Sequence, residues 1–515
     1  MAIALRFYDA CIPTNAVNSP YFHKVVDKIT SMGHGYKAPN YHALRVNLLR
    51  DAKTKLIIDS FRSHWAEVGC TIMGDGWIET RQRPLINFLV YCSKGLSFIK
   101  SVNASNFITD AKTLGNFFAE ILEFVGPNNV VHMVTDNGAN YKVAGRKFSE
   151  RYPTIRWSPC AAHCINLIMK DMSKMNDVKN VATLASMVTV FIYNHKWTLN
   201  WLRMRPGWKE IVHLGATRFA TTLIALKSLH DHKYHLQALV LSDAYKKFLK
   251  MPKGREVKQI VLDERFWNNS LIFVRIMTPL IRLLCICDSN EKPSLGYVYD
   301  GMYRARKGIK NLFKGRKTLY KPYTALIKGR WDRMLRHDLH AVAYWFNLVF
   351  QYDQENSCKK LEIMRGVLDV IDKKKLYKKQ KLVYEIPFFR DKEQGFSQDL
   401  AITSCRTIRP DDWWKIFGYG APTLQKLAIR ILSQKSSSSG CERNWSVFEH
   451  IHTKKRNRLE HQRLNDLVYV HYNLRLQNRS KVDKRSYDPI DYESIDKPEF
   501  WILEEEEEGE LDIDE

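Results

Sequence analysis

The sequence predicts an α/β fold that contains a mixed sheet, a long all-helical segment and a helical C-terminal region. Three observations lead to this prediction. Short apolar runs typical of strands fall between residues 70 and 158, where they come to alternate with helical patterns. Residues 175–409 show long amphipathic helical stretches and few strand signals. A serine run at 436–439 is then followed by two further helical patterns.

The first strands are expected directly after a helical lead-in. Residues 1–69 show apolar and basic residues at roughly helical period until the break at Gly69, and we expect them to pack against the sheet. Three short strands are predicted at 70–73, 85–91 and 96–102. The sequence CSKG between the last two predicts a hairpin turn.

The rest of the sheet is expected to alternate strands with helices. A helix over 110–125 is ended by Gly126 and Pro127. Residues 130–135 form a continuous apolar run, which is typical of a central strand covered on both faces. Three further elements follow: a helix over 140–150, a strand at 154–158 and a helix over 161–174. This order of elements predicts a mixed sheet.

The C-terminal helices carry apolar stripes at helical spacing. Pro410, Pro422 and the serine run predict a flexible approach to them. In the first of these helices Glu442 lies in the first turn, with Trp445 and Phe448 on one face. The second carries a stripe at Leu464, Leu467, Val468, His471 and Leu474. A stripe of this kind usually belongs to the core of its own chain.

Composition predicts a soluble, basic protein that acts on a polyanion. Lys and Arg outnumber Asp and Glu by 80 to 55, and nine of the acids lie in the last twelve residues. Nucleic acid is therefore the first candidate partner, and residues 479–515 are expected to form a disordered acidic tail. Ten cysteines without a Cys-x-x-Cys pair indicate reduced intracellular thiols rather than a disulfide scaffold. We expect no signal peptide and no apolar run long enough to span a membrane.

Three acids stand where catalytic carboxylates occur in α/β proteins. Asp75 and Asp136 each follow an apolar, strand-like run at the point where it breaks at Gly or Asn. Glu442 projects from the first turn of a packed helix, a position that the helix dipole alone would also favour for a carboxylate. If the three acids meet, their oxygen atoms would suit a Mg2+ ion.

Five stretches in this order resemble the hAT superfamily of DNA transposases, particularly its plant group. They are TIMGDGWIET around Asp75, VVHMVTDNGAN around Asp136, CAAHCIN at 160–166, TRFATT at 217–222 and SSSSGCERNW around Glu442. The resemblance covers about residues 6–476. It implies a ribonuclease H-like sheet, whose first part spans 70–174 and which a large helical insertion over 175–409 interrupts. Residues 410–478 would then hold the last catalytic helix and the C-terminal dimerisation region.

The resemblance also implies a chemistry and the residues that perform it. Enzymes of this class cleave DNA with two divalent cations, Mg2+ or Mn2+, which activate the attacking oxygen and stabilise the leaving one. Asp75, Asp136 and Glu442 match the three metal-binding acids of the family. His163 matches the His of its Cys-x-x-His motif, which is thought to assist strand transfer, although a structural role fits the sequence equally well. For Cys160 a buried structural role is favoured, because the second ligand pair of a zinc site is lacking.

Two further groups are candidates for contact with DNA. Arg218 and Phe219 stand where the family has Arg and Trp, and this Trp supports a flipped base. Phe can stack on a base with a smaller face, and core packing is its alternative use. Seven cations lie within fourteen positions of one predicted helix: Arg304, Arg306, Lys307, Lys310, Lys314, Arg316 and Lys317. They suit phosphate contact, and they suit a solvated helix face as well.

The predicted function is that of a transposase-like nuclear DNA-binding protein with metal-dependent strand cleavage and transfer activity. It would dimerise through the C-terminal stripe, at Leu464, Leu467, Val468 and Leu474. Basic clusters at 373–381 and 454–458 could serve nuclear import. The part before Asp75 lacks the Cys and His pattern of the family's BED zinc finger, which would read transposon ends. The alternative is a domesticated, non-catalytic protein that dimerises and regulates transcription.

Overall fold

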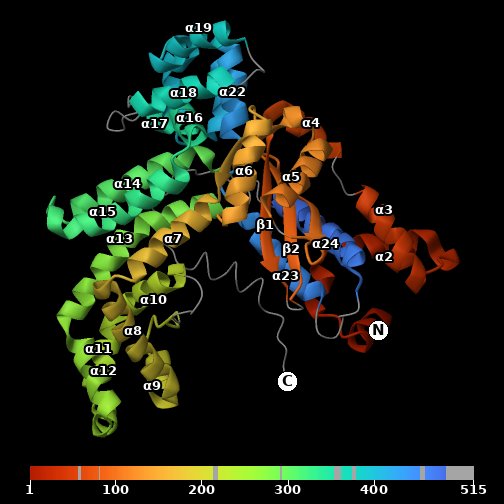
Figure 1. Ribbon diagram of the computed structural model, residues 1–515. Helices are drawn as coiled ribbons and strands as arrows, with labels where there is room; N and C mark the ends of the chain where they lie inside the picture. Colours follow the sequence, from red (N-terminus) through yellow and green to blue (C-terminus); the bar gives the residue numbers. More distant parts are fainter. Residues whose placement is uncertain are drawn as a thin grey trace. The chain divides into compact units, whose positions relative to one another are not determined.

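The computed structural model describes nine segments of the chain (Figure 1), at 1–55, 59–79, 82–108, 110–212, 219–289, 293–352, 361–373, 378–452 and 459–482. The chain divides into two compact units, Met1–Leu56 and Ile57–Glu515. The predicted acidic tail therefore lies almost wholly outside the described residues. The basic cluster at 454–458 and part of the one at 373–381, which were considered for nuclear import, also lie outside the described residues.

The first unit is helical, as predicted for the start of the chain. Its α-helices are α1 (Ala2–Asp9), α2 (Pro20–Met32) and α3 (Leu48–Lys55). Helix α2 is capped by Ser19, whose hydroxyl accepts a hydrogen bond from the Tyr21 backbone N–H, and Pro20 occupies its first turn. Phe7 is the one buried side chain among the described residues of this unit, and its ring meets that of Phe22 edge-on.

The second unit begins with helix α4 (Asp59–Val68), which the sequence assigned to the same lead-in. The lead-in predicted over 1–69 is thus divided between the two units. Trp65 and Val68 of α4 are fully buried in one core cluster with residues of the first two strands. This burial explains why the helical pattern continues to the Gly69 break.

A five-stranded mixed sheet forms the centre of the second unit, so the predicted mixed α/β architecture is confirmed. Its strands are β1 (Cys70–Ile78), β2 (Pro84–Cys92), β3 (Gly95–Asn103), β4 (Val130–Thr135) and β5 (Arg156–Pro159). They lie in the order β3-β2-β1-β4-β5. Strand β1 pairs antiparallel with β2 and parallel with β4, and β2 and β3 form the predicted hairpin. Strand β5 extends the parallel part beyond β4.

Strand β1 is longer than predicted and runs through Asp75, which pairs with Asn87 of β2. The two glycines beside Asp75 therefore do not end the strand. They leave room for ring side chains, since a Cβ on Gly74 would lie 2.6 Å from the Phe118 ring and one on Gly76 2.6 Å from the Tyr141 hydroxyl. The expectation that Asp75 follows a strand end is corrected: it lies within the strand.

The two faces of the sheet are covered by helices from distant parts of the sequence. Helices α4, α5 (Ala111–Val125) and α6 (Ala139–Arg151) share a core cluster with alternate residues of β2, such as Phe88 and Val90. The intervening residues, such as Leu89, pack in another cluster with α23 (Ser439–Ile451) and α24 (His461–Val482). Helix α23 packs on β1 and β2, and α24 packs on β3 (Figure 1). The C-terminal helices are therefore part of the sheet domain.

Between strand β5 and helix α23 the described residues form only helical elements. The α-helices are α7 (Ala161–Ser173), α8 (Asn176–Asn194), α9 (Lys196–Arg203), α10 (Phe219–Asp231), α11 (Lys233–Leu241), α12 (Pro252–Leu262), α13 (Glu264–Asp288), α14 (Val298–Leu312), α15 (Lys317–Arg330), α16 (Asp338–Phe346), α17 (Leu348–Gln351), α18 (Leu361–Lys373), α19 (Lys379–Arg390), α20 (Asp399–Ser404), α21 (Pro410–Phe417) and α22 (Pro422–Leu432). One hydrophobic cluster joins most of them and includes the fully buried Trp267, Trp345, Trp413 and Trp414.

Helix α13 is long and apolar enough to cross a membrane, contrary to the expectation from the sequence. It packs against α7, α10 and α14, and it contributes Trp267, Leu280 and Cys287 to the core. Arg275 and Arg282 interrupt its apolar sequence. The structure uses α13 as a core helix of the insertion.

Candidate functional site

Asp75 is a buried carboxylate on the sheet face that α23 and α24 cover. Met73 and Trp77, two residues before and after it in β1, lie on the same face and pack in the cluster formed with those helices. Asp75 is only 4% exposed, and its Oδ1 accepts a hydrogen bond of 2.9 Å from the Gly76 backbone N–H. Burial, and after it the charges of Asp136 and Glu442, raise the pKa of Asp75 well above its usual range.

Asp136 lies next to Asp75 because of the register of two parallel strands. Gly74 of β1 pairs with Thr135 of β4, so Asp75, which continues β1, and Asp136, which directly follows β4, lie at the same level of neighbouring strands. The Asp136 side chain is 32% exposed, and its Oδ1 lies 3.5 Å from Nδ1 of His163. His163 stands in the first turn of α7, which starts directly after β5. The structure therefore brings Asp75, Asp136 and His163 to one end of the sheet.

Glu442 reaches this place from helix α23, where it occupies the first turn as predicted. The helix packs on β1 and β2, and its Trp445 ring stacks on Trp77 with centroids 5.6 Å apart and planes 16° apart. Since Trp77 is two residues beyond Asp75 on one face of β1, and Trp445 one helical turn beyond Glu442, this stack brings both acids to the same side.

The three acids are thus neighbours, although 306 residues separate Asp136 from Glu442 in the sequence. The negative charges of Asp75 and Glu442 also raise the pKa of the buried Cys441 thiol, after its desolvation. Within the described residues, however, no group of three or more His, Cys, Asp or Glu side chains is arranged to hold a metal ion. Carboxylate oxygens are the ligands that Mg2+ prefers. A bound cation would also relieve the repulsion between the three carboxylates.

The serine run before α23 is a buried strut, so the predicted flexible approach is wrong. Residues 434–439 are at most 5% exposed. Their polar groups are satisfied by distant parts of the chain. Lys435 N–H donates to the Thr71 hydroxyl, the His132 ring donates to Lys435 O, Ser436 N–H donates to the Ser294 hydroxyl, and Ala161 N–H donates to Ser436 O. Glu442 is therefore carried by a segment fixed to the sheet, to α7 and to the insertion.

Cys160 is hydrogen-bonded to this strut. It caps the N-terminus of α7, and its Sγ accepts hydrogen bonds from the backbone N–H of His163 and of Ser438. Burial raises the pKa of the Cys160 thiol to about 11. A neutral, buried thiol of this kind neither attacks nor binds zinc readily, which supports its structural role.

The candidate DNA contacts are only partly described. Arg218 lies outside the described residues, and Phe219 is the first residue of α10. The seven predicted cations do not lie on one helix, because a turn over 313–316 separates α14 from α15. Six of them are exposed, namely Arg304, Lys307, Lys310, Lys314, Arg316 and Lys317, whereas Arg306 is half-buried. Arg304 is paired at 2.6 Å with the buried Asp300.

The stripe predicted for dimerisation is divided between core and surface. Leu464 and Val468 are fully buried on the sheet side of α24, in the cluster that contains Phe98 and Leu89. These two residues therefore pack within their own chain, because α24 covers one face of its own sheet. Leu467 and Leu474 are half-buried, and His471 is exposed.

Two family models match the sequence. One is a domain of unknown function (DUF659), matched over residues 39–188, and the other is the hAT family C-terminal dimerisation region, matched over residues 380–474. The matches support an hAT-family transposase-like protein that dimerises. No curated protein matches the sequence. The first match contains Asp75, Asp136 and His163, and the second contains Glu442 and most of α24.

Sequence reasoning missed two side chains beside the acids of this transposase-like protein. Trp77 stacks under Trp445 and so joins the elements that carry Asp75 and Glu442. Tyr141 lies over Gly76, and its buried hydroxyl makes no hydrogen bond within the part of the chain that the structure describes. The spacing of the tryptophans from the acids, at two and three residues, was the available signal for the stack.

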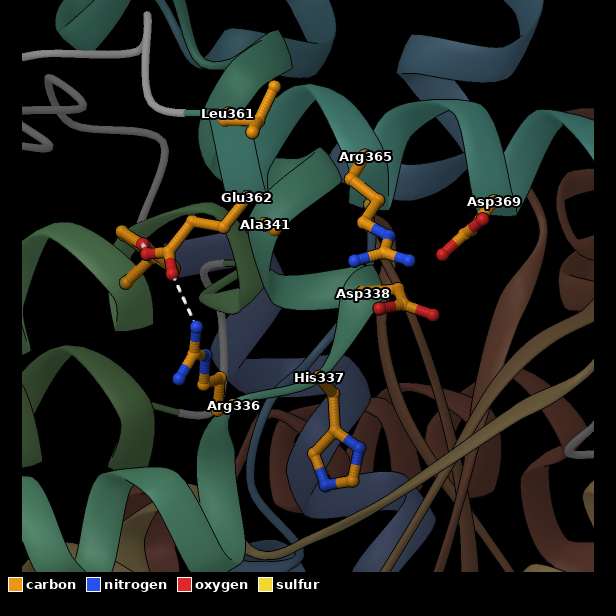
Figure 2. A pocket seen from close by; sticks show the side chains of 10 residues that line it. Arg336, His337, Asp338, Ala341, Leu361, Glu362, Arg365 and Asp369 are labelled. Atoms are coloured by element: carbon orange, nitrogen blue, oxygen red, sulfur yellow. Dashed lines mark hydrogen bonds and ion pairs between the residues drawn. The ribbon is translucent and has the colours of Figure 1, made fainter.

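A separate pocket of about 740 Å³ lies in the helical insertion (Figure 2). Its polar lining residues largely come from α18 and from the start of α16, and Arg336 pairs there with Glu362 at 2.5 Å. His337 of this pocket meets the Trp157 ring edge-on, and Trp157 donates a hydrogen bond of 3.0 Å to the Thr135 hydroxyl. One wall of the pocket is thus linked, through Trp157, to the end of the strand that precedes Asp136.

Proposed function

We propose that this hAT transposase-like protein binds DNA in the nucleus and cleaves and transfers DNA strands with Mg2+ or Mn2+. The observation that carries the proposal is the convergence of Asp75, Asp136 and Glu442 from three separate elements. A mixed sheet with helices on both faces and a helical segment inserted before its last helices is also what a ribonuclease H-like transposase core would require.

In this proposal Asp75, Asp136 and Glu442 hold the cations, whose charge activates the attacking oxygen and stabilises the leaving oxygen of the scissile phosphate. The buried Asp75 is the carboxylate that gains most from a cation, because repulsion by its two acidic neighbours would be relieved. His163 has Nδ1 beside Asp136, which leaves Nε2 to contact a phosphate or to move a proton. The strut at 434–439 keeps Glu442 in place while DNA binds.

The test is a nicking assay on supercoiled plasmid DNA with the full chain. We expect nicks with Mg2+ or Mn2+ and none with EDTA. The alternative, a domesticated non-catalytic protein that regulates transcription, forecasts DNA binding and dimers but no nicks with either cation. The absence of nicks under all metal conditions, with DNA binding shown in parallel, would decide for this alternative.

DNA affinity is expected to fall steeply with salt and to depend little on sequence. A protein that neutralises six to ten phosphates loses about 10³- to 10⁵-fold in affinity between 50 and 200 mM salt. Replacing Lys314 and Lys317 with Gln should reduce the slope of log affinity against log salt by about 2, if both contact phosphates. Fluorescence anisotropy with labelled duplexes measures this slope. Lys246→Gln serves as control, since Lys246 is an exposed lysine outside the predicted set and pairs with Asp243.

A slope that is unchanged in the double variant would remove the α14–α15 hairpin from the DNA interface. A flat salt dependence of the parent protein, or strong preference for one short duplex, would contradict phosphate-dominated binding altogether.

A further inference from the structure

A row of polar side chains crosses the sheet beside the candidate site. Asp75 of β1 pairs with Asn87 of β2, and Asn87 in turn pairs with Ser101 of β3. Side chains directly opposite each other on antiparallel strands share a face, with their Cβ atoms about 4.5–5.5 Å apart. Asp75, Asn87 and Ser101 therefore form one line on the sheet face that α23 and α24 cover.

This polar row lies in an apolar environment. Leu85 and Leu89, two residues before and after Asn87 in β2, point to the same face and are buried in the cluster shared with α23 and α24. Asn87 is 0% exposed and Ser101 is 6% exposed. A buried polar group lowers stability unless it is hydrogen-bonded, so apolar residues would serve packing better at both positions. Packing alone therefore does not account for the row.

Asn87 has unused hydrogen-bonding capacity beside Asp75. Neither Nδ2 nor Oδ1 of its amide makes a hydrogen bond within the part of the chain that the structure describes, and the same holds for the Ser101 hydroxyl. Among these residues, the Asp75 carboxylate accepts only the hydrogen bond from the Gly76 backbone N–H. Hydrogen bonds stabilise an ionised carboxylate, and at the spacing of paired strands a rotation of the Asn87 side chain suffices to supply one.

Asn87 also contacts the helix that carries Glu442. The Cys441 thiol donates a hydrogen bond of 3.8 Å to the Asn87 backbone carbonyl. Cys441 directly precedes Glu442 in the first turn of α23. Asn87 is therefore linked to the elements of both acids, to β1 by strand pairing and to α23 by this thiol.

We propose that Asn87 is a positioning residue for the metal site, whose amide Nδ2 donates a hydrogen bond to the Asp75 carboxylate and fixes this carboxylate for the cation. The Ser101 hydroxyl donates to Oδ1 of Asn87 and thereby orients the amide. The inference rests on the proposed metal-dependent function and adds a residue outside the three acids. Because Asn87 acts through Asp75, it supports the affinity for the cation and takes no part in the chemical step.

The test is isothermal titration calorimetry of the full chain with Mn2+, which requires no DNA cleavage. Asn87→Leu keeps the shape of the side chain and removes both amide groups. It is expected to raise the Mn2+ dissociation constant 10- to 100-fold, the usual effect of losing a hydrogen-bond partner of a metal ligand. Ser101→Ala should raise the constant by a smaller factor, because the Asn87 amide remains.

Ser97→Ala is the matched control for these variants. Ser97 also lies on β3, is 3% exposed, and its hydroxyl makes no hydrogen bond among the described residues. It pairs with Val90, which belongs to the cluster on the opposite face of the sheet. The Mn2+ dissociation constant of Ser97→Ala should therefore equal that of the parent protein.

Two further measurements separate positioning from a structural role. Asn87→Leu should leave the Tm in EDTA unchanged or raise it, because an amide without a partner is replaced by an apolar group of the same shape. In the nicking assay it should raise the Mg2+ concentration that gives the half-maximal rate, while the rate at saturating Mg2+ is largely kept. Weaker Mn2+ binding together with a lower Tm in EDTA would assign Asn87 to packing and overturn the inference.

The outcome also separates this inference from the proposed function. If the parent protein binds Mn2+ and Asn87→Leu binds it equally well, the inference is wrong and the three-acid site stands. A parent protein that binds no Mn2+ would overturn both the inference and the proposed metal-dependent cleavage.

Discussion

Glu442→Gln is expected to reduce Mg2+-dependent nicking more than about 100-fold, with DNA binding and dimerisation retained. The substitution keeps the shape of the side chain in the first turn of α23 and removes its charge. Since the loss of even an outer partner of a metal ligand typically costs 10- to 100-fold, the loss of a ligand should exceed that range. Asp75→Asn should behave alike, because Asp75 is buried at the same place. Single-turnover nicking at saturating Mg2+ measures the effect.

Glu449→Gln is the control for this prediction, because Glu449 is exposed on the same helix. Metal binding itself can be followed without activity. A ligand at 100 times its dissociation constant stabilises the folded state by about 2.7 kcal/mol, so Mg2+ should raise the Tm of the parent and of Glu449→Gln. A Glu442→Gln protein that nicks at the parental rate would exclude the three-acid site.

The raised pKa of Asp75 also predicts how the stability of the metal-free protein, in EDTA, changes with pH. In the unfolded chain this carboxyl ionises near its ordinary pKa of about 3.9, while in the folded protein it stays protonated to higher pH. The folded state is therefore penalised as pH rises above that ordinary value. Without metal, Asp75→Asn should have a higher Tm than the parent at neutral pH, and the difference should shrink toward pH 4.

Leu464→Ala is expected to lower the free energy of unfolding by about 2–5 kcal/mol, the usual range for a leucine removed from a packed core. The reason is that Leu464 fills the contact between α24 and the sheet, at 0% exposure. Urea denaturation at two protein concentrations measures the loss. The effect should be the same at both concentrations, because the lost contacts are within one chain.

Leu474→Ala is the matched control for Leu464→Ala, since Leu474 is half-buried on the same helix. We expect it to destabilise the protein distinctly less. If Leu464→Ala instead dissociated a dimer and left the stability of the monomer unchanged, the burial of Leu464 within its own chain would not describe the protein in solution.

The sequence predicted correctly those elements whose ends are determined by residues close to them in the chain. Strand β4 was placed correctly because its run of mostly apolar residues is buried on both faces, and helix α5 because Asp110 caps its start and Gly126 ends it with a φ of 96°. Strand β1 was predicted too short, since Gly74 and Gly76 look like a strand end. Only the rings of Phe118 and Tyr141, which lie on other elements, show why glycine is required there.

The arrangement of the candidate site could not be deduced from local pattern. The register of β1 with β4 places Asp75 beside Asp136. The sequence predicted this meeting from two strand ends, although only Asp136 follows one. The approach of Glu442 was not predictable from periodicity and came from the family resemblance. The serine run was misread because four hydroxyl side chains suggest a solvated loop, whereas Ser294, Cys160 and Thr71 satisfy it from remote positions.

The serine strut also determines when the proposed three-acid site can form during synthesis of the chain. A chain that has left the ribosome as far as residue 433 carries the five strands of the described sheet, Asp75, Asp136 and the helical insertion, but not the strut or the helix with Glu442. Because the strut is bonded to Ser294 as well as to β1 and β4, it can settle only after the insertion has docked. Closing contacts over hundreds of residues is a late and slow step of folding. A chain that ends before the strut would therefore hold two of the three acids, and any DNA-cutting activity would be withheld until α23 had been made and docked.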